Sequence, residues 1–274
     1  MAPTSTEPVV AQLQEVWSSI EEAGAGLPAE AWERPTDCPG WTVRDHVSHL
    51  VGIERTLLGE AAPPAPDGPP PEHVRNPIGE LNEAWVADRR GRPGAEVLAE
   101  FAEVTARRLK ELAGFDTARF DEVGWSPVGQ VPYRVFMEVR VFDSWVHEQD
   151  MRRALGRPGG RHGAGEEVSL RRVGSGIGFV VGKKVAPPDG TSVIFDVTGE
   201  GGRPLAVVME GGRGREPEQP PEHPTVRLVL DTTTFWRLGC GRLSPGEALA
   251  AGDVALTGDV DLGRRVLDAM NIMI

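Results

Sequence analysis

The 274-residue chain has no long apolar run, only two cysteines and little lysine. Its apolar stretches are a few residues long, whereas a helix that crosses a bilayer needs about 20, so we expect no transmembrane segment. The first residues, MAPTSTEPVV, show neither the basic nor the apolar segment of a secretory signal. Cys38 and Cys240 alone cannot build a disulfide framework, and they match no CxxC metal motif. These features predict a cytoplasmic protein.

Positive charge is also scarce. The chain has 29 lysines and arginines, of which three are lysine, against 41 aspartates and glutamates, which gives a net charge of −12. Such an excess repels nucleic-acid phosphates and anionic lipid surfaces, and no basic stripe offsets it locally. We therefore expect a small molecule as the partner, with neither nucleic acid nor membrane, and the sequence gives no indication of the oligomeric state.

Apolar side chains recur every three or four residues through the first part of the chain, which indicates helices. These helical patterns cover residues 7–22, 42–57, 78–89, 93–112 and 132–156. A proline-dense segment at 61–71 is expected to be a loop, because proline is excluded from helix and sheet interiors. Helices of this length joined by loops favour an antiparallel bundle.

The second part of the chain has more glycine and proline and contains short β-branched runs. Possible strands at 192–198, 205–209, 226–230 and 254–257 are interleaved with helical patterns at 232–238, 245–250 and 259–270. Such a sequence is typical of a small α+β domain. We expect a helical bundle over residues 1–160 and an α+β domain over residues 161–274.

A polar row on the last helix of the bundle is the strongest functional signal. Arg140, Asp143, His147 and Asp150 follow one another at intervals of three and four, so they share one helix face. Apolar residues flank this row on both sides, which predicts that it points into the bundle. Buried charges are costly unless they pair with one another or hold a metal. The spacing leaves both possibilities open.

Two histidines lie on the helix that begins near residue 42: His46 near its start and His49 at its centre. Together with Asp143 and His147, His49 gives two imidazoles and one carboxylate. Such a set leaves a coordination position open, as catalytic zinc sites require, and it also suits iron, nickel or manganese. The alternative is a purely structural core histidine. Trp41, between a loop and a helix start, is the tryptophan most expected to line a pocket.

Two segments resemble the mycothiol-dependent maleylpyruvate isomerase family: CPGWTVRDHVSHL at 38–50 and DSWVHEQD at 143–150. The C-terminal segment from 235 to 264 is similar to that family as well. Family members are DinB-like helical bundles followed by a domain of the sterol-carrier type. The resemblance covers essentially the whole chain and therefore implies an α+β fold of this kind.

The resemblance also implies a ligand set. A divalent metal, usually zinc, would be held by His49, Asp143 and His147. Family members often carry glutamate where this chain has Asp143, and the shorter side chain puts the metal distance or the metal identity in doubt. By the same comparison, Asp150 contacts the thiol cofactor mycothiol, and Arg242 contributes from the second domain. His46 is not the motif histidine and is expected to support the site or the core.

The implied chemistry is attack by a thiolate. A metal would lower the pKa of the mycothiol sulfur, which would attack a small electrophile and give cis–trans isomerisation or S-transfer. Arg140 and Arg242 are candidates to bind a substrate carboxylate, with ion pairing to Asp143 or Asp150 as the alternative. We thus predict Arg140 and Asp150 as catalytic residues, and Asp150, Arg242 and Trp41 as cofactor-binding residues.

Two other functions stay open from the sequence. The chain could be a non-catalytic module that binds a metal or a ligand. It could also be a metal-dependent hydrolase with water in place of the thiol, in which Glu148 or Asp150 would have to serve as the general base.

Overall fold

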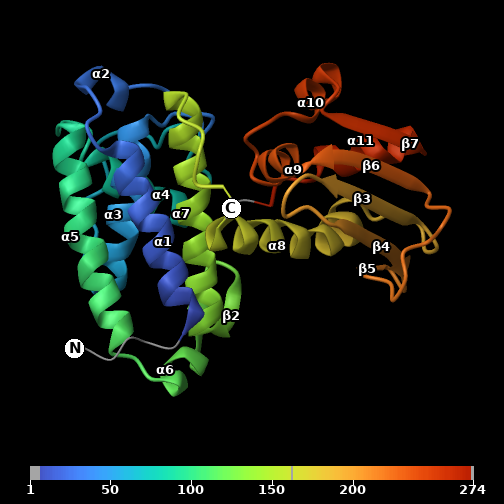
Figure 1. Cartoon of the computed structure of the whole chain (residues 1–274), viewed down its shortest axis with the longest axis horizontal. Coiled ribbons are helices and arrows are strands. Elements are labelled where there is room, and N and C mark those ends of the chain that lie inside the picture. Colours follow the sequence, from blue (N-terminus) through green and yellow to red (C-terminus); the bar gives the residue numbers. More distant parts are fainter. Residues whose placement is uncertain (1–6, 162, 273–274) are drawn as a thin grey trace. The chain divides into compact units, whose positions relative to one another are not determined.

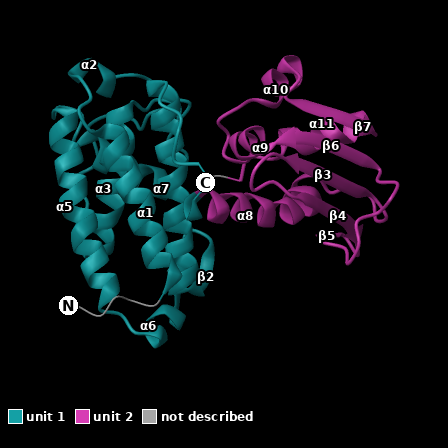
Figure 2. Ribbon diagram, viewed as in Figure 1, with its two compact units in different colours: residues 1–165 teal, residues 166–274 magenta. Residues whose placement is uncertain are grey.

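The computed structural model describes residues 7–161 and 163–272. The chain divides into two compact units, residues 1–165 and 166–274 (Figures 1 and 2). The described part of unit 1 is helical apart from one hairpin and an isolated bridge, and unit 2 contains a five-stranded sheet with helices, so the predicted α+β class is confirmed. Among the described helices, none is both long and apolar enough to cross a membrane.

Unit 1 is built on five long helices. Its elements are α1 (Pro8–Gly24), α2 (Ala29–Trp32), α3 (Val43–Leu57), α4 (Pro77–Ala87), α5 (Gly94–Ala113), α6 (Thr117–Asp121), β1 (Val123–Ser126), β2 (Gly129–Pro132) and α7 (Tyr133–Leu155). Helix α1 packs against α5 and α7, while α3 packs against α4, α5 and α7 (Figure 1). The five predicted helices are confirmed as α1, α3, α4, α5 and α7; the hairpin and the two short helices were not predicted.

Local signals fix the start of α3 and the end of α7, the two helices that carry Arg140, Asp143 and the buried histidines. At the start of α3, the backbone N–H of Thr42 donates to Asp45 Oδ2 at 3.0 Å, which satisfies one group left open at a helix terminus. Helix α7 ends at Gly156, whose φ of 65° lies in the left-handed region that glycine adopts without steric cost.

Unit 2 is organised around a mixed sheet. Its elements are α8 (Ala164–Phe179), the π-helix η1 (Val180–Val185), β3 (Ser192–Thr198), β4 (Pro204–Glu210), β5 (Arg213–Arg215), β6 (Val226–Asp231), α9 (Thr232–Gly239), α10 (Pro245–Ala251), β7 (Val254–Gly258) and α11 (Val260–Asp268). The strand order is β5-β4-β3-β6-β7, with β3 and β6 parallel and the other pairs antiparallel. The four predicted strands and three predicted helices of this region are confirmed.

One face of this sheet carries its apolar core. Val193, Phe195 and Val197 alternate along β3, as side chains on one face of a strand must, and all three are buried. Phe195 lies beside Phe235 of α9, with ring centroids 6.2 Å apart. Helices α9 and α11 and the π-helix contact the strands, so the unit has a core of its own.

In unit 1, a carboxylate on α5 binds arginines from α3 and from the connection between α4 and α5. Glu100 accepts hydrogen bonds from Arg55 Nε at 2.7 Å, from Arg89 Nη2 at 2.7 Å and from Arg92 Nη1 at 2.5 Å. Burial alone would raise the pKa of Glu100, but the hydrogen bonds and charges of the three arginines lower it to about 2. This carboxylate therefore stays ionised in the folded chain at pH values where a free glutamate is protonated.

The lowered pKa of Glu100 predicts a pH effect on stability. Because an unfolded glutamate has a pKa of about 4.3, the ionised carboxylate stabilises the folded state above that pH, and the contribution is lost as the pH falls toward 2. We expect the unfolding free energy of Glu100→Gln to fall less than that of the unmutated protein between about pH 5 and 3, measured by urea titration at several pH values. Glu103→Gln, exposed on the same helix, should follow the unmutated protein; equal slopes for all three would contradict the prediction.

Candidate metal centre

Helices α3 and α7 bring three histidines together inside unit 1. His46 and His49 come from α3 and His147 from α7, and all three are buried. On α7, Arg140 and Asp150 are buried as well, and the side chain of Asp143 is 18% exposed. The prediction that the polar row of α7 points into the bundle is therefore confirmed.

Two groups of side chains around His147 offer three ligand atoms close together. In the first, the Asp143 triad (His49, Asp143 and His147), His49 Nε2 lies 3.2 Å from Asp143 Oδ2 and His147 Nε2 lies 3.6 Å from Asp143 Oδ1. Zinc bonds of about 2.0–2.1 Å in a tetrahedral arrangement separate neighbouring ligand atoms by roughly 3.3 Å. The donor set and its spacing therefore fit a divalent ion.

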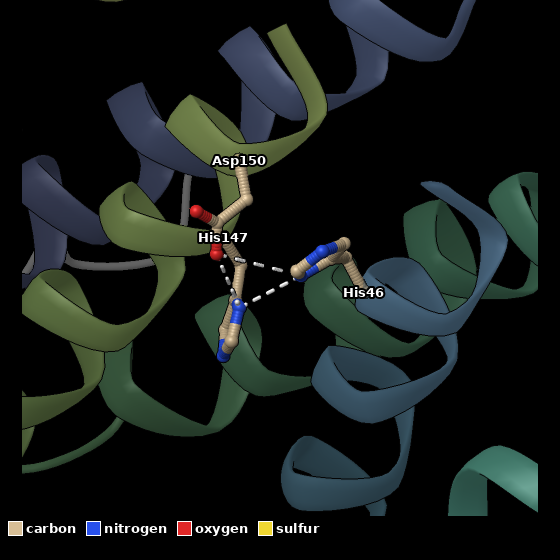
Figure 3. A group of neighbouring side chains, drawn as sticks. All are labelled: His46, His147 and Asp150. Atoms are coloured by element: carbon tan, nitrogen blue, oxygen red, sulfur yellow. Dashed lines mark hydrogen bonds and ion pairs between the residues drawn. The ribbon is translucent and has the colours of Figure 1, made fainter. Parts of the chain in front are cut away.

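The second group, the Asp150 triad (His46, His147 and Asp150), is drawn in Figure 3. It meets the His147 ring at Nδ1, whereas Asp143 lies near Nε2. Nδ1 of His46 and Nδ1 of His147 are 2.8 Å apart, a hydrogen-bond distance that is shorter than the spacing of two metal ligands. Asp150 Oδ2 lies 3.6 Å from the His147 nitrogen and 3.9 Å from the His46 nitrogen. The two imidazoles are hydrogen-bonded to each other, and Asp150 lies at ion-pair distance from both. Nε2 of the same His147 ring faces Asp143.

A buried chain of ion pairs holds Asp143. Arg140 donates from Nη1 to Asp143 Oδ2 at 2.6 Å and from Nε to Glu54 Oε1 at 2.9 Å. The second oxygen of Glu54 accepts from Arg108 Nε at 3.0 Å. Burial would raise the pKa of Asp143, but Arg140 and the two histidines hold it well below its usual range. The carboxylate is therefore ionised and its orientation is fixed, and the Arg140–Asp143 ion pair considered from the sequence exists beside the triad.

The pKa values of the two histidines of the Asp143 triad are shifted in opposite directions. Burial lowers the pKa of His49, and Asp143 only partly opposes this shift. Burial would lower the pKa of His147 too, but Asp143 and Asp150 raise it above its ordinary value. Asp143 lies at Nε2 of His147 and Asp150 at Nδ1. A cation bound at Nε2 would have to replace a proton there, so metal and proton compete for that nitrogen.

Trp41 forms one wall of this centre. Its ring centroid lies 5.5 Å from that of His46, 5.2 Å from His49 and 5.5 Å from His147, and the residue is only 8% exposed. Among the described residues, Trp41 Nε1 and Arg140 Nη2 find no hydrogen-bond partner although both atoms are buried. Buried donors of this kind ordinarily meet water or a ligand.

The other predicted site residues are placed as follows. Asp150 is fully buried beside the histidines rather than at an open surface. Arg242 belongs to unit 2, where its Nη1 donates to the carbonyl oxygen of Cys240 at 3.1 Å. The roles of both in binding a thiol stay predictions. Glu148 accepts hydrogen bonds from Ser19 Oγ at 2.5 Å and from Arg152 Nε at 2.6 Å.

Three residues of the network were not predicted from the sequence: Thr36, Glu54 and Arg108. Thr36 lies in a loop and its Oγ1 is 2.8 Å from His46 Nε2. The sequence holds only a weak indication that Glu54 is buried: it is an acidic residue that directly follows the apolar segment 50–53. Its two arginine partners come from α5 and α7, and no local pattern connects those helices.

Comparisons with known proteins cover both units. Residues 13–152 match the family model of the mycothiol maleylpyruvate isomerase N-terminal domain, and residues 181–271 match that of the SCP-2 sterol transfer family. Two crystal structures share the fold over 92% of this chain and 92% of theirs: mycothiol-dependent maleylpyruvate isomerase, with a TM-score of 0.55 and 15% identity, and a histidine-to-alanine mutant of that enzyme, with 0.58 and 14%. The predicted fold, a DinB-like helical domain followed by a sterol-carrier-like domain, is thus confirmed.

Curated sequences are similar over a shorter range. The uncharacterized protein Rv0036c of Mycobacterium tuberculosis is 27% identical over 152 residues, which is 54% of this chain and 57% of that protein. The same values hold for the uncharacterized protein MT0041 of a second strain of that species. The chain therefore spans little more than half the length of these relatives.

Proposed function

The chain belongs to the family defined by the mycothiol maleylpyruvate isomerase N-terminal domain, and from this premise we propose that it is a divalent-metal-dependent enzyme with mycothiol as its thiol cosubstrate. The proposed reaction is attack of a thiolate on a small electrophile, which gives cis–trans isomerisation or S-transfer. The observation that carries the proposal is the Asp143 triad, where two imidazoles and an ionised carboxylate meet at ligand spacing.

We propose that His49, Asp143 and His147 hold the ion, with zinc as the first choice and nickel, iron or manganese as alternatives. Such an ion would lower the pKa of a thiol bound to it, so that the sulfur is nucleophilic near neutral pH. Asp143 is the most exposed member of the triad. Its side of the centre is therefore the side from which a thiol would approach.

Arg140 is proposed to serve both the ion site and the substrate. Through Nη1 it holds Asp143 in its orientation, and its buried Nη2 lacks a partner among the described residues. A guanidinium N–H in this state suits a carboxylate oxygen of the substrate. Trp41 covers the three imidazoles. The contacts of Asp150 and Arg242 with mycothiol stay predictions.

A thermal-shift measurement with two thiols tests the cosubstrate. We expect mycothiol to raise the melting temperature of the zinc-loaded protein, because a ligand at 100 times its Kd stabilises by about 2.7 kcal/mol. Glutathione, which lacks the sugar portion of mycothiol, is expected to give little shift. Equal shifts with both thiols, or no shift with either, would contradict the choice of mycothiol.

The structure offers less support for a hydrolase. Of the two acids that would have to act as base, Glu148 is engaged by Ser19 and Arg152. Burial also raises its pKa. Asp150 is fully buried on the Nδ1 side of His147, away from Nε2, where an ion would sit. Asp150 thus meets the Asp143 triad at Nδ1 of His147, not at the nitrogen that would hold an ion.

A further inference from the structure

A chain of hydrogen bonds leads from His147 to a loop outside α3 and α7. Nδ1 of His147 contacts Nδ1 of His46 at 2.8 Å, and Nε2 of His46 contacts Thr36 Oγ1 at 2.8 Å. Thr36 Oγ1 also accepts from the backbone N–H of Cys38 at 3.2 Å and donates to the carbonyl oxygen of Trp41 at 3.2 Å. We propose that His46 and Thr36 are positioning residues that set the tautomer of His147, an inference that rests on the proposed ion site.

The number of protons on the two imidazoles and the threonine hydroxyl decides which atom donates in each hydrogen bond of this series. A neutral imidazole carries one proton, so Nε2 of His147 can be a ligand only when the proton is on Nδ1. The nitrogen 2.8 Å away, Nδ1 of His46, must then accept that proton in a hydrogen bond. His46 consequently carries its own proton on Nε2 and donates it to Thr36, whose hydroxyl hydrogen is left for the carbonyl of Trp41. Every donor in this arrangement has an acceptor.

The opposite direction gives up the hydrogen bond from Thr36 to the carbonyl of Trp41, since a hydroxyl has one hydrogen, and it closes the ligand position. If Thr36 donates to His46 Nε2, then His46 Nδ1–H donates to His147 Nδ1, and the proton of His147 sits on Nε2 facing Asp143 Oδ1 at 3.6 Å. The three residues therefore change together between one state that accepts a cation and one that does not.

Asp150 does not choose between the two states, because its Oδ2 lies at similar distances, 3.6 Å and 3.9 Å, from the two Nδ1 atoms. Its charge attracts a proton on either nitrogen. The tautomer of His147 is therefore set by His46 and Thr36. Because His46 is fully buried, no bulk water can replace it as the acceptor for His147 Nδ1–H. His46 thus acts on the ion through His147 and is not itself a ligand.

Zinc affinity, measured by competition with a chelator, tests the role of His46. His46→Ala removes the acceptor for His147 Nδ1–H, and we expect it to weaken zinc binding by about 10–100-fold, the usual effect of losing a partner of a metal-bound histidine. His46→Asn, which keeps an oxygen acceptor close to the position of Nδ1, is expected to recover most of that loss. His73→Ala, whose ring contacts Glu83 in another part of unit 1, serves as the control.

The outcomes separate this inference from the proposed function. If the unmutated protein binds zinc and His46→Ala binds it equally well, the positioning role is wrong and the proposed function stands. If the unmutated protein binds no divalent ion, both are wrong. Recovery in His46→Asn supports a hydrogen-bonding role over a role in packing alone.

A spectroscopic test does not depend on a folded His46→Ala variant. In protein with ¹⁵N-labelled histidine rings, two-bond proton–nitrogen correlations distinguish the two tautomers. For the zinc-loaded protein we expect His147 protonated on Nδ1 and His46 protonated on Nε2, and we expect Thr36→Val, but not Thr36→Ser, to shift the His46 ring signals. His46 protonated on Nδ1, or bound to zinc through Nδ1, would overturn the proposal.

Discussion

His147→Ala is expected to reduce the metal content of the purified protein from about one divalent ion per chain to near zero. His147 supplies one of three ligand atoms in the Asp143 triad, and the remaining pair, His49 and Asp143, gives too few donors to retain an ion through purification. The same ring also contacts His46 at 2.8 Å through Nδ1. Its removal therefore eliminates both the ligand atom Nε2 and the hydrogen bond to His46. Elemental analysis of protein purified without chelator measures the effect.

The matched control for this experiment is His223→Ala. His223 is exposed in unit 2, so its loss should leave the metal content unchanged. Far-ultraviolet circular dichroism of both variants shows whether the helices are intact. A folded His147→Ala protein that retains a full complement of metal would remove the Asp143 triad as the ion site, and with it the observation that carries the proposed function.

The polar row of α7 was predictable because its signal is local. Arg140, Asp143, His147 and Asp150 reveal a shared face by spacing alone, and the flanking apolar residues show that this face turns inward. His49 could be added as a candidate because it sits at the centre of a helix with a periodic apolar face and a clear start signal. Periodicity and capping are properties of a few consecutive residues, so a single sequence is enough to read them.

The segment from 164 to 185 was not assigned, and glycine is the reason. Gly174, Gly176, Gly178 and Gly182 lower the helical tendency of this stretch by roughly 1 kcal/mol each relative to alanine, yet it forms α8 and the π-helix. A Cβ on Gly182 would lie 2.3 Å from the backbone nitrogen of Gly214 in β5. The glycine there permits close backbone approach, which depends on tertiary packing and not on the local pattern.

The supporting residues of the centre were missed for a similar reason. The role of Glu54 follows from its position between Arg108 of α5 and Arg140 of α7, and that of Thr36 from a loop that reaches His46. Each contact joins elements whose pairing is set by packing of the whole bundle. The sequence could therefore indicate the residues that face an ion, but not the residues that hold them in place.

Glu54→Gln is expected to lower the free energy of unfolding of unit 1 by about 3–5 kcal/mol, because it leaves two buried guanidinium groups without their shared carboxylate. Glu54, Arg108 and Arg140 are all at least 95% buried. Burial would lower the pKa of Arg108, but Glu54 and Tyr133 raise it, so the guanidinium stays charged and needs a counterion. Glutamine keeps the shape of the side chain but supplies no charge to either partner.

Glu111→Gln provides the matched control, since it makes the same chemical change at another partner of Arg108. The side chain of Glu111 is 38% exposed, and exposed ion pairs contribute about 0–1 kcal/mol. Urea unfolding followed by tryptophan fluorescence reports mainly on unit 1, because six of the seven tryptophans lie within residues 1–165. If Glu54→Gln destabilises no more than Glu111→Gln, the buried charges balance without Glu54. Asp143 would then have to hold Arg140 alone, and the fixed orientation of that carboxylate toward His49 and His147 would need another cause.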